Sequence, residues 1–234
     1  MMQAWHDPRI INGTRQQLRL RRELLAAGKK QLGWKLAFGG PVAMQRLQIN
    51  APLVGFLMQD AMVASGSAIS FAGWKKPAAE PEITVYLGKD VPPKADRKTI
   101  MSAIAGLGAA IEVADVDHPS DDVEGTLARN IYQRHLILGE CDTSHAGGGL
   151  SGLNARVIRN GQEFANTSEF ETLTGELISI VGHVANLLSF FHEELCDGQI
   201  IIAGSITPPI WVQAGESLVF QLEPQPSISV TFTA

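Results

Sequence analysis

The sequence predicts an α+β fold in which a mixed, curled β-sheet follows a small N-terminal helical segment. After residue 65 most of the chain reads as short apolar segments broken by glycine and proline, which is typical of strands and turns. Two internal segments have helical spacing, too few for the regular β-α alternation of a parallel nucleotide-binding sheet. Hydrophobic residues make up 45% of the 234 residues and charged residues 18%, so the chain has enough apolar surface for a packed core.

The first predicted element is a helix over residues 12–27, which ends at Gly28, a suitable left-handed stop. Basic residues gather on this helix, and Leu18, Leu24 and Leu25 supply its apolar side, so we interpret the basic cluster as a solvated face. We expect an N-terminal helical arm of residues 1–32 and a main domain of residues 33–234.

Within the main domain a short helix is predicted to open at Pro41, because a proline in the first helical turn loses no hydrogen bond. Two longer helices are predicted over residues 96–106 and 177–195. Strands are expected at residues 52–58, 68–71, 82–87, 109–116, 152–159, 200–206, 218–222 and 228–232, and the last of them alternates strictly between apolar and polar residues.

Composition excludes several classes of protein. A net charge of −5 offers no electrostatic footprint for a phosphate backbone, so we expect no nucleic acid partner. Two cysteines without paired spacing argue against a disulfide scaffold or a zinc ribbon. The N-terminus lacks a signal-peptide pattern, and no apolar run approaches the ~18 residues of a membrane span. We therefore expect a cytoplasmic protein without membrane contact.

The most informative segment contains Glu80 and Glu82 on either side of Pro81. In an extended chain residues two apart project from the same face, which brings the two carboxylates side by side. Pro81 cannot donate to a sheet ladder, so we expect this segment at the edge or rim of a sheet, open to solvent. A pair of surface glutamates on an edge strand is the alternative interpretation.

A third acid favours a metal site. The segment from Ala109 to Asp115 reads as a strand in which Glu112 shares its face with Ala110 and Ala114. An unpaired charge among apolar residues costs several kcal/mol unless a cation offsets it. Three carboxylates, with waters in the remaining positions, suit Mg²⁺ or Mn²⁺, whereas Zn²⁺ usually recruits histidine or cysteine.

These acidic strands occur with three further motifs, Gly33-Trp-Lys35-Leu, Pro52-Leu-Val-Gly-Phe-Leu and Ile200-Ile-Ile-Ala-Gly-Ser-Ile-Thr207. Together, from Gly33 to the C-terminus, they resemble the fumarylacetoacetate hydrolase superfamily. Within it the chain is similar to the 2-keto-4-pentenoate hydratase and 4-oxalocrotonate decarboxylase branch.

The resemblance implies a β-roll-like catalytic domain and a metal held by Glu80, Glu82 and Glu112. It also implies that Lys35 faces the substrate, where an ammonium would be a fixed electrostatic donor. The residues that we expect to be catalytic are Lys35, Glu82 and Thr207, and those that we expect to bind substrate are Lys35, Leu53, Ser205 and Thr207.

The expected reaction is hydration of a 2-hydroxy-2,4-dienoate to a 4-hydroxy-2-oxo acid by a homo-oligomeric enzyme. Decarboxylation of a 2-oxo-dioate and C–C hydrolysis of an acylpyruvate are alternatives, because the chain departs from its relatives: Asn50 stands where an acid is frequent, and Asn130 is followed by Ile131 and Tyr132 instead of small hydroxyl residues. No His-Glu lid pair is evident, although His118 and His135 could act as bases. Two non-enzyme alternatives are an inactive metal-binding partner subunit and a plain carbohydrate- or lipid-binding β-domain.

Overall fold

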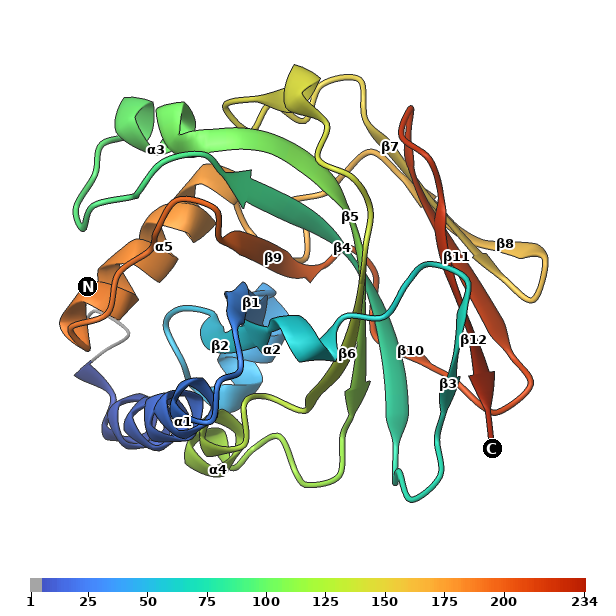
Figure 1. The fold of residues 1–234 in the computed structure, drawn as a ribbon, viewed down its shortest axis with the longest axis horizontal. Coiled ribbons are helices and arrows are strands. Elements are labelled where there is room, and N and C mark those ends of the chain that lie inside the picture. The colour runs from blue at the N-terminus through green and yellow to red at the C-terminus, as the bar shows by residue number, and fades with distance from the viewer. Residues whose placement is uncertain (1–5) are drawn as a thin grey trace.

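A computed structural model describes residues 6–234, and residues 1–5 at the start of the expected arm lie outside the described residues. The larger sheet of the described part curves, with β4 and β5 bending around β1, β2 and β9 (Figure 1). Strands β1 and β9 run parallel, and the other pairs of this sheet are antiparallel. In spatial order its strands are β2 (Leu53–Met58), β1 (Gln31–Ala37), β9 (Ile200–Ser205), β4 (Pro77–Leu87), β5 (Ile104–Asp115) and β6 (Gln133–Leu138), with β10 (Ile210–Trp211) paired to β4.

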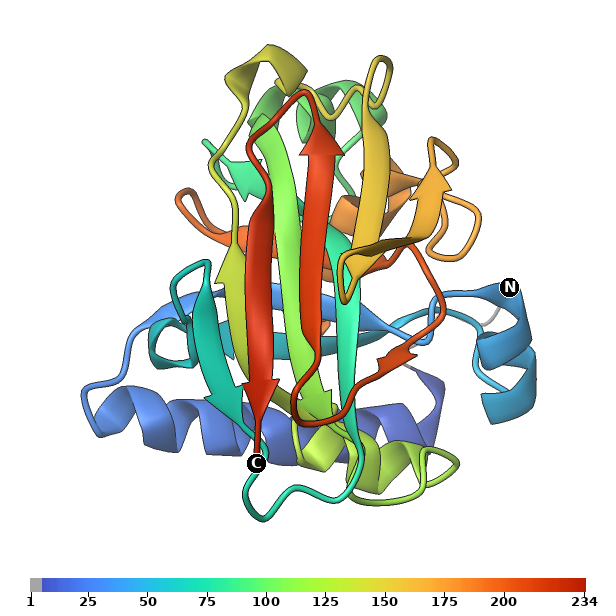
Figure 2. The ribbon, with the colours of Figure 1, turned by 90° about the vertical axis from the view of Figure 1, so that its right-hand side faces the viewer.

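A second sheet covers the long strands of the first (Figure 2). Its inner face contributes Phe220 and Phe232, which are fully buried, to the main hydrophobic core. One of its strand pairs, β12 with β3, is parallel, so both sheets are mixed and the expected α+β class is confirmed. The strands, in spatial order, are β3 (Ser67–Ser70), β12 (Ile228–Thr233), β11 (Ser217–Glu223), β7 (Asn154–Arg159) and β8 (Gln162–Thr167).

The helices of the described residues lie around the larger sheet (Figure 1). Helix α1 begins four residues earlier than expected, because Pro8 suits a first helical turn and the Asp7 side chain accepts a hydrogen bond from the Arg9 N–H at 2.9 Å. The helices are α1 (Pro8–Ala26), α2 (Pro41–Leu47), α3 (Arg97–Ala103), α4 (Val123–Ala128) and α5 (Leu177–Phe190), with short 3₁₀ turns η2 (Gln59–Ala61) and η3 (Thr143–His145).

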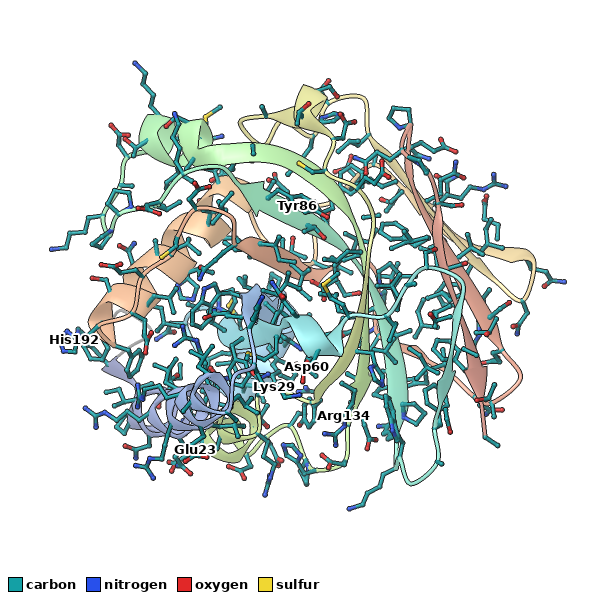
Figure 3. The ribbon with its side chains drawn as sticks, in the orientation of Figure 1. Glu23, Lys29, Asp60, Tyr86, Arg134 and His192 are labelled. Carbon is teal, nitrogen blue, oxygen red and sulfur yellow. The ribbon has the colours of Figure 1, made fainter. Side chains whose placement is uncertain are left out.

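Helix α1 packs closely against α4. A Cβ on Gly13 would lie 2.7 Å from the Leu127 Cβ, so only glycine permits this approach. The Gln17 amide donates to the Leu127 carbonyl at 3.0 Å, which satisfies a buried polar group across the contact. Beyond the helix, Lys29 pairs with Asp60 of η2 at 2.6 Å on the surface (Figure 3). The division into an arm of residues 1–32 and a domain of residues 33–234 stays a prediction.

Several elements differ from expectation. The helices expected at Pro41 and over residues 96–106 and 177–195 are present as α2, α3 and α5. One further helix, α4, was not expected; it has six residues and is capped by Asp122, whose carboxylate accepts from the Gly125 N–H at 2.9 Å. Strands β1, β6, β8 and β10 were not expected, and most of β8 is polar and exposed. Helix α3 is shorter than expected because β5 already begins at Ile104. No helix within residues 6–234 combines the length and the apolar character needed to cross a membrane.

Candidate active site

The pairing of β4 with β5 brings three glutamates together. Glu80 lies directly opposite Glu112, and Glu82 lies opposite Ala110. Because side chains alternate along both strands, all three carboxylates project from one face. One oxygen from each lies within 4.8 Å of the others, so the three carboxylates converge as expected. That they hold a metal stays a prediction.

The environment of the glutamates is more enclosed than expected. Glu82 and Glu112 are 1% and 0% exposed, and Glu80 is partly exposed. Strand β4 lies between β9 and β5, so the expectation of an edge strand at Pro81 was wrong. The strand tolerates the missing N–H of Pro81 because β9 ends opposite Glu82 and β10 begins opposite Ala79. The ladder on this side of β4 is therefore interrupted at Pro81.

Burial sets the electrostatics of this cluster. It raises the pKa of Glu80 to about 7, with the charge of Glu112 adding to the shift and Lys35 opposing it. It also raises the pKa of Glu82 well above the ordinary value, with Glu112 and Glu80 adding and Lys35 opposing. The pKa of Glu112 is raised by burial too, against the influence of Lys35. Three charged carboxylates at this spacing therefore require positive charge nearby.

Lys35 supplies part of that charge. Its side chain on β1 is 1% exposed, and its ammonium donates to Oε1 of Glu112 and to the Ile131 carbonyl at 3.0 Å. This places Lys35 at the glutamates rather than on the outer surface. The other oxygen of Glu112, Oε2, is buried and has no hydrogen-bond partner.

Gly204 completes the glutamate cluster from β9. Its N–H donates to Oε2 of Glu82 at 2.7 Å. The residue has a φ of +96°, and a Cβ there would lie 3.2 Å from the Thr174 side chain, so the position requires glycine for its backbone conformation. Sequence reasoning missed this donor, although the glycine inside an otherwise apolar strand was a signal of an unusual backbone position.

A divalent cation fits these residues. Three negative charges and one positive charge leave the ionised cluster with a net charge of −2. The partnerless Oε2 of Glu112 is an orphaned buried acceptor of the kind that a metal satisfies. The three candidate ligands are all carboxylates, which suits hard ions such as Mg²⁺ or Mn²⁺.

The structure brings one of the other expected substrate-binding residues, Ser205, next to the glutamates, and it shows no contact of Thr207 or Leu53 with them. Ser205 is opposite Glu82 in the β4–β9 ladder and is partly exposed. Thr207 is buried two residues beyond the end of β9, where its hydroxyl donates to the Pro208 carbonyl at 3.0 Å rather than to a glutamate. Leu53 is 1% exposed in an apolar cluster that also contains Ile131 and Tyr132.

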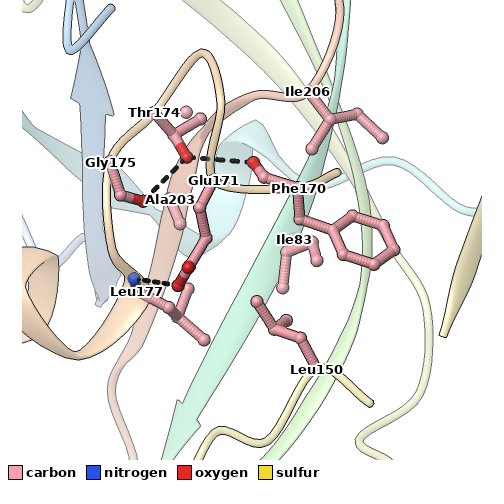
Figure 4. A pocket seen from close by; sticks show the side chains of 10 residues that line it. Ile83, Leu150, Phe170, Glu171, Thr174, Gly175, Leu177, Ala203 and Ile206 are labelled. Carbon is pink, nitrogen blue, oxygen red and sulfur yellow. Dashed lines mark hydrogen bonds between the residues drawn. The ribbon is translucent and has the colours of Figure 1, made fainter. Parts of the chain in front are cut away.

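A small cavity lies behind Gly204, on the face of β4 that carries Ile83 rather than Glu82 (Figure 4). Its volume of about 10 Å³ is that of one water-sized sphere. Phe170 and Thr174 belong to a turn that closes it, and the Glu171 carboxylate accepts from the Leu177 N–H at 2.7 Å at the start of α5. The cavity backs the glutamate cluster and is too small for an organic substrate.

The two histidines considered as bases differ in position. His135 lies opposite Val113, hence on the face of the sheet away from Glu112, where its ring stacks on Trp74 with centroids 5.9 Å apart. Nδ1 of His118 lies 2.6 Å from the Asp117 carboxylate, which can accept its hydrogen, and Nε2 of His118 is buried without a partner. The Asp117–His118 pair therefore has the arrangement of an oriented base, and His135 does not face the glutamates.

The sequence matches a known family and several curated relatives. Residues 34–233 match the family described as fumarylacetoacetate (FAA) hydrolase C-terminal. The chain is 27% identical to 2-hydroxyhexa-2,4-dienoate hydratase of Comamonas testosteroni, with 92% of this chain and 82% of the relative covered. It is 24% identical to 4-oxalocrotonate decarboxylase of a Pseudomonas species, with 88% and 80% covered.

Solved structures share the fold. That of 4-oxalocrotonate decarboxylase from Pseudomonas putida G7, complexed with magnesium and adipate, superposes with a TM-score of 0.84 at 24% identity, covering 92% of this chain and 83% of the other. Fumarylpyruvate hydrolase from Pseudomonas aeruginosa, in complex with Mn²⁺ and pyruvate, gives 0.68 at 13% identity, with 87% and 90% covered. Because the family match extends over most of the chain, this protein belongs to the fumarylacetoacetate hydrolase C-terminal family.

Proposed function

We propose that this protein is a divalent-metal-dependent hydratase that adds water to a 2-hydroxy-2,4-dienoate and forms a 4-hydroxy-2-oxo acid. The observation that carries the proposal is the buried cluster of three convergent glutamates and one lysine, in a chain related over 92% of its length to a hydratase of such a dienoate. In this proposal Glu80, Glu82 and Glu112 hold Mg²⁺ or Mn²⁺. When bound, the ion would act as a Lewis acid toward the oxygens of the substrate.

The remaining chemistry falls to side chains of this chain. The Lys35 ammonium is held by two hydrogen bonds and is shielded from water, so its charge stabilises a neighbouring carboxylate or oxyanion more strongly than an exposed lysine would. We assign Lys35, Glu82 and Thr207 to catalysis, and Lys35, Leu53, Ser205 and Thr207 to substrate binding. Burial of this cluster excludes bulk water, which favours addition of one positioned water molecule.

The overall change is balanced by one water. Protonation of the dienol at C5 gives a ketone at C2 that is conjugated with the remaining double bond between C3 and C4. Water then adds at C4, the electron pair of the double bond takes up a proton at C3, and the product is a 4-hydroxy-2-oxo acid. A conjugated enone needs less activation at this step than an unactivated double bond, so a single ordered water suffices.

C–C hydrolysis is the second candidate, and one observation favours it. The Asp117–His118 pair offers an oriented imidazole with a free buried Nε2, and hydrolysis of an acylpyruvate needs such a base to activate water against a carbonyl. His118 lies against Tyr132, the neighbour of the Ile131 carbonyl that holds Lys35.

The 24% identity to 4-oxalocrotonate decarboxylase supports decarboxylation of a 2-oxo-dioate as a third reaction.

Product analysis separates these reactions. The purified protein is incubated with a 2-hydroxy-2,4-dienoate, a 2-oxo-dioate and an acylpyruvate, each with Mg²⁺, with Mn²⁺ and with EDTA. We expect the 4-hydroxy-2-oxo acid to form fastest, and only with metal. Faster release of CO₂ or of pyruvate would replace the hydratase by the decarboxylase or the hydrolase. Turnover of none of the three would favour an inactive partner subunit, and the absence of any Mg²⁺ effect on stability would favour a plain binding domain.

Homo-oligomeric assembly and a cytoplasmic location complete the proposal. A sedimentation measurement checks the assembly, with a single species at 25.2 kDa as the result that excludes it.

A further inference from the structure

The segment from Asn130 to Tyr132 has an uncommon backbone. All three residues have positive φ, at 58°, 52° and 63°. Asparagine tolerates the left-handed region, but a β-branched isoleucine and a bulky tyrosine are rarely found there. Such a conformation persists only where the surrounding structure imposes it, and it is frequent at functional sites.

Contacts at both ends hold this left-handed turn in place. The Asn130 N–H donates to the Leu127 carbonyl at 2.9 Å, and the Asp115 N–H donates to the Tyr132 carbonyl at 3.0 Å. The Tyr132 hydroxyl also donates to the His118 carbonyl at 3.1 Å. Asn130, Ile131 and Tyr132 are each less than a tenth exposed, so solvent does not relax the turn.

The side chain of Asn130 ties the turn to β2. Its Oδ1 accepts from the Phe56 N–H at 2.8 Å, and its Nδ2 donates to the Phe56 carbonyl at 2.9 Å. Strand β2 is an edge of the larger sheet, so these outward backbone groups have no strand partner, and the amide takes that place. The pairing fixes the turn relative to the strand next to β1, where Lys35 lies.

Gly55 of β2 lies between the Lys35 side chain and the Asn130 amide. It lies directly opposite Lys35 in the β1–β2 ladder. A Cβ at Gly55 would lie 2.9 Å from Cγ of Lys35 and 3.1 Å from Oδ1 of Asn130. Glycine therefore lets the lysine side chain run across β2 beside the Asn130 amide, and the ammonium reaches the Ile131 carbonyl at 3.0 Å.

We propose that Asn130, acting through the left-handed turn 130–132, is a positioning residue for Lys35. The turn aims the Ile131 carbonyl at the ammonium, which is thereby held on Oε1 of Glu112 and kept out of the space between the three carboxylates. Oε2 of Glu112 then stays available to a cation. The second half of this inference rests on the proposed metal site, and the first half does not.

The direct test observes the lysine ammonium in the metal-free protein by ¹H–¹⁵N NMR. An ammonium that is buried and hydrogen-bonded exchanges its protons slowly and gives a visible signal, whereas solvated lysines exchange fast. Lys35→Arg identifies the signal, because it removes the ammonium and keeps a positive charge. In Asn130→Ala we expect the signal to disappear or its proton exchange to become about ten-fold faster, since the supporting hydrogen bonds are lost.

Asn160 provides a matched control. It is also a left-handed asparagine, with φ of 52°, and its Oδ1 accepts a backbone hydrogen bond from Ser217 at 2.8 Å in the second sheet. Asn160→Ala should leave the ammonium signal as in the wild type. If Asn130→Ala does not fold, Asn130→Asp serves instead, because it keeps the acceptor for the Phe56 N–H and loses the donor. An unchanged signal in the folded Asn130 variant overturns the proposal.

Mn²⁺ binding measured by EPR tests the second half. Loss of a group that orients a ligand commonly weakens metal binding about ten-fold or more, and we expect this for Asn130→Ala but not for Asn160→Ala. A released ammonium with unchanged Mn²⁺ affinity contradicts the idea that the turn keeps the cation space clear. If wild-type protein binds no Mn²⁺ while the ammonium signal responds as expected, the proposed metal site fails and the positioning of Lys35 stands.

Discussion

Replacement of Lys35 by methionine removes the ammonium and retains a side chain of similar volume beside Gly55. In the metal-free protein Glu112 would then be a carboxylate without its counter-charge, in a cluster where the side chains of both partners of the original pair are 1% exposed. Removal of one partner of a buried ion pair costs about 3–5 kcal/mol, a large share of the ~5–15 kcal/mol by which domains are stable. We expect a loss of this size in the free energy of unfolding.

Urea denaturation in EDTA measures this loss, and Lys29→Met is its control. Lys29 pairs with Asp60 at 2.6 Å, but the two side chains are 47% and 49% exposed, so that substitution should cost at most about 1 kcal/mol. A second substitution, Glu112→Gln, in the Lys35→Met protein should recover part of the stability, because it removes the uncompensated charge. Saturating Mn²⁺ should also reduce the loss. If Lys35→Met costs no more than Lys29→Met, the ammonium does not neutralise a buried carboxylate and the electrostatic reasoning is refuted.

Three further outcomes follow from the site and its surroundings. Glu80→Gln should leave the metal-free protein as stable as the wild type or more so, because burial and Glu112 already raise the pKa of Glu80 to about 7. The same substitution should weaken Mn²⁺ binding in a calorimetric titration, and unchanged Mn²⁺ affinity would remove Glu80 from the set of metal ligands. Gly204→Ala should cost about 1–3 kcal/mol in urea denaturation, because alanine is strained at a φ of +96°, and a cost near zero would show that the backbone can relax there. Burial lowers the pKa of His183 from its usual value of 6.5, although Nε2 of its ring lies 3.0 Å from the Pro52 carbonyl. As the pH falls, the unfolded chain therefore binds the proton before the folded protein does, and the free energy of unfolding should fall below about pH 6.5. The His183→Gln protein should lose less stability than the wild type between pH 7.5 and 5.5, and equal losses would contradict this assignment.

The glutamate cluster could be predicted because its signal is local. Side chains two apart on a strand share a face, and a lone acid among alanines needs a partner, so Glu80, Glu82 and Glu112 were recognisable before their strands were known to pair. The position of Lys35 depended on family resemblance, since a lysine between Trp34 and Leu36 is not distinctive by itself. Its pairing with Glu112 joins residues 77 positions apart, which local patterns do not encode.

Other features depended on tertiary contacts. We expected Pro81 at a sheet edge because it lacks an N–H. It lies instead in the central strand β4, at the gap between the end of β9 and the start of β10. Helix α4 is too short for a clear apolar period, and α1 stabilises it by packing. The role of Asn130 is invisible in the sequence, because its amide bonds to the backbone of Phe56, which any residue type would present.

The central claim is that one divalent cation binds between the three glutamates, and anomalous diffraction from crystals grown with Mn²⁺ tests it most directly. We expect a single strong anomalous peak with one oxygen each of Glu80, Glu82 and Glu112 at about 2.1 Å, including Oε2 of Glu112, which is buried without a partner. The peak should be absent from a Glu112→Gln crystal soaked in the same way. A wild-type map with no Mn²⁺ at this cluster, or with the ion held by other residues, would contradict the claim.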